Sequence, residues 1–101
     1  MNAKLCLGTA QFGLDYGITN RSGKVNDEVV KFLLKKAIKE DISYIDTASA
    51  YGNSENILGK QLKDNPININ TKFTTNKNKK FTVEEIESLE IKFHKTLKRL
   101  N

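Results

Sequence analysis

The chain has 101 residues, of which 38% are hydrophobic and 29% charged, and this composition indicates one small globular domain that is too apolar to be a disordered chain. No apolar run approaches the roughly 18 residues of a membrane-spanning helix, and the N-terminus holds no apolar stretch for a secretory signal, so we expect a cytoplasmic protein with no role in a membrane. The net charge of +5 is spread along the chain apart from one lysine cluster (Lys77, Lys79 and Lys80), and the single Cys6 excludes a disulfide framework and a cysteine-pair metal site.

The first predicted unit is a strand, a loop and a helix. Residues 4–9 (KLCLGT) form a short apolar run, in which we expect Cys6 to be a small buried hydrophobe, and repeated glycines after it predict a long loop. Asn26 is a predicted helix N-cap, because acidic residues follow it and lysines lie at the far end of the apolar pattern. The predicted buried face of this helix holds Val30, Leu33, Leu34, Ala37 and Ile38.

The next two units repeat this alternation. Residues 42–47 (ISYIDT) predict a second strand with Asp46 at its carboxyl end, and residues 54–63 predict a short helix. Residues 67–73 predict a third strand with Lys72 near its carboxyl end. The order of these elements is therefore strand and helix in strict succession.

The last predicted helix has the clearest start in the sequence. Thr82 and Glu85 have the spacing of a capping box, in which each side chain satisfies a backbone amide of the other, and Phe81 and Ile86 occupy the hydrophobic-staple positions. The helix is predicted to run to the end of the chain. Its predicted apolar stripe consists of Ile86, Leu89, Phe93, Leu97 and Leu100.

Strand-then-helix units in series predict a parallel sheet covered by helices, because parallel neighbours need long crossover connections. Two architectures satisfy this pattern, an open doubly wound sheet and the start of a (β/α)8 barrel. Three units in 101 residues average about 34 residues each, close to the roughly 31 per unit of a barrel of about 250 residues. We therefore expect an α/β fold in which residues 1–101 form the first three β/α units of a truncated (β/α)8 TIM barrel.

Asp46, Tyr51 and Lys72 lie at or just after the carboxyl ends of consecutive predicted strands, the edge at which parallel sheets and barrels carry their active sites. An inward-facing lysine is costly unless it is paired, and Asp46 is the available counter-ion. A cation beside Tyr51 would lower the pKa of its phenol from about 10, so that the phenol could protonate a carbonyl oxygen near neutral pH. On the residues alone, a purely structural role for all three stays open.

At these residues the sequence resembles the aldo-keto reductase superfamily. Residues 44–59 (YIDTASAYGNSENILG) match its signature at several fixed positions. Residues 7–13 (LGTAQFG) are similar to the family's first strand and loop, and residues 70–73 (NTKF) to its third strand, which carries a Thr-Lys pair. The continuation of the first loop most resembles bacterial members, and the resemblance covers essentially the whole chain.

The resemblance implies an oxidoreductase that transfers hydride from NADPH, or from NADH in some members, to an aldehyde or ketone. Tyr51 would be the general acid, Lys72 would lower its pKa, and Asp46 would hold Lys72 in place. The turn after the first strand matches the family's turn near the nicotinamide ribose, where a glycine lets the backbone approach a ligand. The expected cofactor contacts are Gly8, Thr9, Ala10 and Asp46. The expected partner is a small carbonyl substrate, with no nucleic acid, membrane or metal.

Two features depart from the family pattern. Its fourth catalytic group is a histidine at the end of the fourth strand, whereas His94 lies in the last predicted helix, four residues after Glu90, and is expected to be an exposed helical residue. The family's third helix closes with a run similar to residues 97–100 (LKRL), and the sequence then ends at Asn101. We therefore expect an N-terminal fragment without strands four to eight, with unpaired sheet edges and no appreciable turnover alone.

Two other classes of function stay open. One is a non-enzymatic truncated fragment, or a half-barrel completed by a partner that supplies the missing strands. The weaker one is a basic nucleic-acid-binding module that uses the lysine cluster and the lysine-rich last helix, and salt-dependent association would be its mark. A dinucleotide-binding Rossmann unit fits less well, because Gly8, Gly13 and Gly17 do not form GxGxxG and open a loop instead of a helix.

Overall fold

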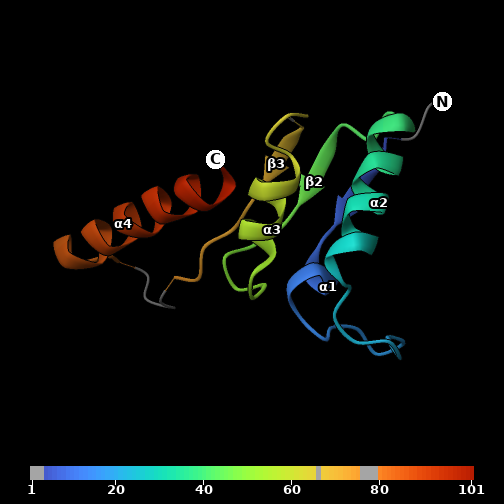
Figure 1. The fold of residues 1–101 in the computed structure, drawn as a ribbon. Helices are drawn as coiled ribbons and strands as arrows, with labels where there is room; N and C mark the ends of the chain where they lie inside the picture. Colours follow the sequence, from blue (N-terminus) through green and yellow to red (C-terminus); the bar gives the residue numbers. More distant parts are fainter. Residues whose placement is uncertain (1–3, 66, 76–79) are drawn as a thin grey trace.

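The structure is a computed structural model that describes residues 4–65, 67–75 and 80–101. Figure 1 shows these residues as a small sheet with helices packed on one side, followed by a long helix that ends at the C-terminus. Two members of the lysine cluster, Lys77 and Lys79, lie outside the described residues. The structure therefore leaves the basic-module interpretation untested.

The sheet contains the predicted strands in parallel. β1 (Cys6–Gly8), β2 (Tyr44–Asp46) and β3 (Asn68–Asn70) pair in the order β1-β2-β3. Each strand is shorter than the run predicted for it, since the ladder pairs only three residues of that run. The parallel alternation expected of the first units of a barrel is confirmed.

Helices connect the strands and cover one face of the sheet. α1 (Ala10–Gly13) and α2 (Asp27–Lys39) lie between β1 and β2, α3 (Ser54–Gln61) lies between β2 and β3, and α4 (Val83–Leu100) follows β3. In Figure 1 α2 and α3 lie over the same face of the sheet, and α4 packs beside α3. Within the described ranges, the helices are all too short or too polar to cross a membrane.

The register separates a covered face of the sheet from an open one. Leu7, Ile45 and Ile69 form one row across the strands, and Ile45 is fully buried. Because side chains alternate along a strand, the next row, which contains Asp46, belongs to the opposite face. The core on the covered face comprises Phe12, Val30, Leu34, Ile45, Ile57, Leu58 and Leu62.

Two expectations about the first unit are wrong. Cys6 is exposed, because it shares a register row with Tyr44 and so belongs to the open face. The segment after β1 begins with the short helix α1 instead of a loop, and the Phe12 amide donates to the Thr9 carbonyl at 2.9 Å. This turn carries Phe12 into the core, but it is too short to show helical periodicity in the sequence.

α2 begins as predicted, but it buries only part of its predicted face. Asn26 is its N-cap, and the Asn26 side chain accepts a hydrogen bond from the Val29 amide at 2.9 Å. The flank of the predicted face is less covered than expected, since Ile38 is 40% exposed. The residues of the predicted face that are fully buried are Val30, Leu34 and Ala37.

α4 has the predicted start but a different buried side. The capping box is present, with the Glu85 amide donating to Thr82 Oγ1 at 3.2 Å and the Thr82 amide donating to Glu85 Oε2 at 2.7 Å. The predicted stripe is largely uncovered, with Phe93 45% and Leu97 50% exposed. The buried residue of α4 is Thr96, because the helix turns this polar side toward α3.

α3 and α4 approach one another closely at Gly59. A Cβ atom at this position would lie 2.0 Å from the Arg99 carbonyl oxygen. The Asn101 side chain also donates to the Gly59 carbonyl at 3.2 Å. The last turn of α4 can therefore lie against α3 only because residue 59 has no side chain.

Gly59→Ala should lower the free energy of unfolding by about 1–3 kcal/mol, the usual effect of overpacking, although alanine is the better helix former. Gly8→Ala is the matched control, because a Cβ at Gly8 would meet no atom within 4 Å. Urea denaturation of both variants measures the difference. The close packing of α3 on α4 is contradicted if Gly59→Ala is as stable as Gly8→Ala.

Candidate active site

Two oppositely charged side chains meet at the carboxyl edge of the sheet. Asp46 is the last residue of β2 and Lys72 follows the end of β3, so parallel pairing brings both to the same edge. Lys72 Nζ donates to Asp46 Oδ2 at 2.7 Å. The two side chains are 52% and 40% exposed, respectively, which places the pair on the open side of the sheet.

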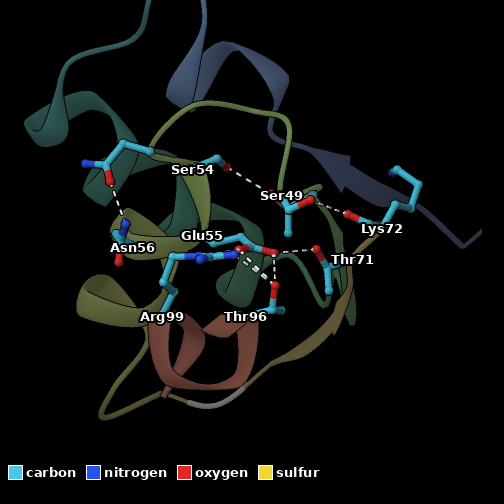
Figure 2. Close-up of polar contacts among 10 residues, drawn as sticks. Ser49, Ser54, Glu55, Asn56, Thr71, Lys72, Thr96 and Arg99 are labelled. Atoms are coloured by element: carbon cyan, nitrogen blue, oxygen red, sulfur yellow. Dashed lines mark hydrogen bonds and ion pairs between the residues drawn. The ribbon is translucent and has the colours of Figure 1, made fainter. Parts of the chain in front are cut away.

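Backbone hydrogen bonds continue the ladder past the ends of these strands. The Thr47 amide donates to the Asn70 carbonyl at 2.8 Å, and the Ser49 amide donates to the Lys72 carbonyl at 2.9 Å. The Ser49 hydroxyl donates to the same carbonyl at 3.1 Å, as Figure 2 shows. The backbone from which the Lys72 side chain projects is therefore fixed by the segment that follows β2.

Tyr51 lies in the turn between β2 and α3. Its amide donates to the Ala48 carbonyl at 3.1 Å, and its carbonyl accepts from the Ser54 amide at 3.0 Å, so hydrogen bonds close the turn on both sides of Tyr51. Lys72 Nζ lies 5.3 Å from the centre of the Tyr51 ring, a distance at which an ammonium is attracted to an aromatic face. The structure thus brings Asp46, Tyr51 and Lys72 together, as the sequence predicted.

The turn that carries Tyr51 packs directly on α1. A Cβ at Gly13 would lie 1.7 Å from the Tyr51 carbonyl oxygen, and a Cβ at Gly52 would lie 2.4 Å from the Gly13 carbonyl oxygen. Gly52 also has a φ of 54°, in the left-handed region that favours glycine. Glycine at both positions allows this contact, and the contact holds Tyr51 against the segment after β1.

The hydrogen bond to Asp46 is the main reason that the pKa of Lys72 is raised above its ordinary value. The negative charge of Asp46 and the nearby phenol of Tyr51 act in the same direction, and partial burial opposes them. The ammonium of Lys72 is therefore charged throughout the physiological range. A fixed cation of this kind can stabilise a negative charge that develops on a neighbouring oxygen.

The residues expected to contact a cofactor near β1 have different environments. Open space lies beside Gly8, which is the register partner of Asp46, and a Cβ there would meet no atom within 4 Å. Ala10 is half-buried at the start of α1. Thr9 is fully buried, and its Oγ1 donates to the Asp46 carbonyl and accepts from Ser54 Oγ, both at 2.9 Å. The Thr9 side chain is thus used inside the fold, and cofactor contacts by these residues stay a prediction.

The sequence interpretation missed a buried carboxylate behind this edge. Glu55, in α3, is only 2% exposed, and it contacts Thr71, Thr96 and Arg99 (Figure 2). The available signal was an acidic residue next to the buried positions of a short helix, together with an arginine in the last turn of α4. Neither feature identifies its partner, because the two helices are far apart in the sequence.

The only histidine of the chain is separate from this site. Its Nε2 atom lies 3.9 Å from Glu90 Oε1, and the side chains of His94 and Glu90 are 66% and 70% exposed. This confirms the expectation that His94 is an exposed helical residue with an acidic partner one turn away.

Comparisons with known proteins place these features in a family. A model of the aldo/keto reductase family matches residues 4–101. A solved structure of a proposed aldo-keto reductase from Pseudomonas aeruginosa is 33% identical, with a TM-score of 0.77, over 97% of this chain and 38% of its own. A second structure from the same organism, of a protein described in the same way, is 31% identical, with a TM-score of 0.74, over 97% of this chain and 36% of its own. The chain therefore spans little more than a third of the length of these structures.

Asp46→Asn should bring the pKa of Lys72 down toward its ordinary value, because the variant loses both the charged acceptor and its attraction. NMR signals of the Lys72 side chain, followed against pH, measure this change. Since the pKa is raised in the folded state, the stabilisation from the Lys72–Asp46 pair is present at neutral pH and is lost as the pH rises above about 10.5.

Glu40→Gln is the matched control for this titration. It removes an ion pair with Lys36 that is also 2.7 Å long and about half exposed, but that lies at the C-terminal end of α2. The titration of Lys72 should be the same in this variant as in the wild type. An unchanged titration of Lys72 in Asp46→Asn as well would show that the pair does not form in solution.

Proposed function

This chain belongs to the aldo/keto reductase family, and we propose that the protein that carries it reduces a small aldehyde or ketone with hydride from NADPH or NADH. The observation that supports this most directly is the grouping of Asp46, Tyr51 and Lys72. Lys72 Nζ lies 2.7 Å from Asp46 Oδ2 and 5.3 Å from the centre of the Tyr51 ring. A proton donor beside a fixed cation is what carbonyl reduction requires in addition to hydride.

In the proposed reaction Tyr51 donates its phenolic proton to the substrate oxygen as negative charge develops there. Lys72 stabilises the phenolate that remains on Tyr51, because its ammonium lies close to that ring. Asp46 holds the ammonium in place through the hydrogen bond to Lys72 Nζ. In the reverse oxidation the Tyr51 phenolate accepts the proton of the alcohol.

The nicotinamide cofactor, when bound, supplies the hydride to the carbonyl carbon. Gly8 would let the nicotinamide ring approach the backbone beside Asp46, because Gly8 has no side chain and a Cβ there would meet no atom within 4 Å. We therefore assign Gly8, Ala10 and Asp46 as cofactor contacts. Thr9 would contribute only through its backbone, since its hydroxyl is hydrogen-bonded inside the fold.

The activity is proposed for the whole protein, because the chain covers only 38% and 36% of the two solved structures. His94 does not supply the histidine that the family resemblance calls for, so this chain contributes three catalytic groups to the proposal. The same proposal includes a bacterial source, which the Pseudomonas origin of both solved structures supports, and a cytoplasmic location.

Tyr51→Phe should lower kcat for aldehyde reduction by about 100-fold or more, because the variant keeps the ring but loses the proton that a general acid donates. The rate is measured as NADPH consumption by the complete gene product with a panel of small aldehydes. Tyr16→Phe is the control, since it removes a phenol that is 59% exposed in the loop after α1. A wild-type rate in Tyr51→Phe would exclude Tyr51 as the general acid.

Gly8→Val should weaken NADPH binding by about tenfold or more, because its side chain would occupy the open space assigned to the nicotinamide ring. Fluorescence titration with NADPH measures the dissociation constant. The melting temperature is the control for folding, since a Cβ at residue 8 meets no protein atom within 4 Å. Unchanged NADPH affinity in a folded Gly8→Val protein would place the cofactor elsewhere.

A further inference from the structure

A buried carboxylate that the proposed reaction does not use lies behind the candidate active site. Glu55 is 2% exposed, and its two oxygens accept hydrogen bonds from three side chains. Thr71 Oγ1 donates to Oε1 at 2.7 Å, Thr96 Oγ1 lies 3.1 Å from Oε1 and 3.2 Å from Oε2, and Arg99 Nε donates to Oε2 at 2.6 Å. The Arg99 guanidinium also pairs with Oε2 through Nη2 at 2.6 Å.

This arrangement compensates the burial of a charge. An isolated carboxylate away from water is strongly unfavourable unless it is paired and hydrogen-bonded, and Glu55 has both kinds of partner. Among the described residues, every buried side-chain nitrogen and oxygen atom has a hydrogen-bond partner. A saturated network of this kind permits few alternative side-chain positions, so its members are held in a defined geometry.

One member of the network is the residue that precedes Lys72. Adjacent residues in an extended segment direct their side chains to opposite faces. Thr71 points toward Glu55 and the helices, and Lys72 points away from them, as Figure 2 shows. Fixing Thr71 by its hydroxyl therefore also fixes the face on which Lys72 projects toward Asp46.

From this geometry we propose that Glu55 is a positioning residue for Lys72. Its carboxylate anchors Thr71 to α3 and, through Thr96 and Arg99, to the last turns of α4. The packing of α4 on α3 is thereby coupled to the placement of the ammonium beside Tyr51. The functional meaning of this coupling rests on the proposed reductase activity, but the coupling itself is a structural property that can be measured without turnover.

The test compares two threonines that donate to the same carboxylate. Thr71→Val and Thr96→Val each remove one hydroxyl that donates to Glu55, and each leaves Glu55 with the other threonine and Arg99. Thr96 is the more buried of the two and also accepts a hydrogen bond from Arg99 Nη2 at 3.0 Å, so Thr96→Val is the more severe change to the network. Only Thr71 is adjacent to Lys72. The local readout is hydrogen exchange of the Ser49 amide, which donates to the Lys72 carbonyl, and the global readout is stability in urea.

We expect Thr71→Val to increase the hydrogen-exchange rate of the Ser49 amide by about tenfold more than it increases the exchange rates of the α2 amides. The same variant should shift the NMR signals of the Lys72 side chain. Thr96→Val should lower global stability without this selective effect, and Thr71→Ser, which keeps the hydroxyl, should restore slow exchange at Ser49. Equal effects of the two valine variants on Ser49, or no effect of either, would overturn the proposal.

Steady-state kinetics of the complete gene product distinguishes this proposal from the reductase proposal. Thr71→Val should lower kcat with little change in KM, since the substrate contacts are kept and the proton donor loses its aligned cation. A wild-type protein without carbonyl reduction would refute the reductase function, and the exchange experiment would still decide whether Glu55 positions Lys72. A kcat in Thr71→Val equal to that of the wild-type enzyme would overturn the positioning proposal.

Discussion

Parallel pairing of three short strands is the constraint on which the candidate site depends. The register aligns Gly8, Asp46 and Asn70 in one row, and every chain segment that leaves this row does so at the same edge. The segments are then held together by hydroxyl groups, since Ser54 donates to Thr9 Oγ1 at 2.9 Å and lies 3.0 Å from Thr47 Oγ1. Residues from all three units therefore meet at this edge of the sheet.

The two ion pairs near this edge have different physical meanings. The Lys72–Asp46 pair is about half exposed, so solvent screens it and it adds little to folding; its value is that it keeps a cation oriented on the open face. The Glu55–Arg99 pair is buried on the carboxylate side, where loss of one partner typically costs about 3–5 kcal/mol. In the proposed reaction the first pair orients the ammonium that acts on Tyr51, whereas the second pair holds α3 and α4 together behind this edge.

Local patterns in the sequence predicted much of this structure. The Asn26 cap, the Thr82–Glu85 box and the parallel order of strands follow from residue spacing, and so does the meeting of Asp46 with Lys72. Long-range packing was not predictable in the same way. The Glu55 network depends on which side of α4 faces α3, and the amphipathic pattern of α4 indicated its apolar stripe instead of the side that carries Thr96. Likewise, α1 spans too few residues to produce a periodic signal.

The contact between Gly13 and Gly52 has a consequence for how this site can change over evolution or in a mutant library. A Cβ at Gly13 would overlap the backbone of Tyr51, and a Cβ at Gly52 would overlap the backbone of Gly13. Because both overlaps are with backbone atoms, no side-chain substitution at a contacting position can relieve them. The two glycines cannot diverge by compensating exchange, as contacting core residues often do. Tolerated substitutions at this edge are therefore expected around this contact between α1 and the Tyr51 turn, while residues 13 and 52 themselves stay glycine.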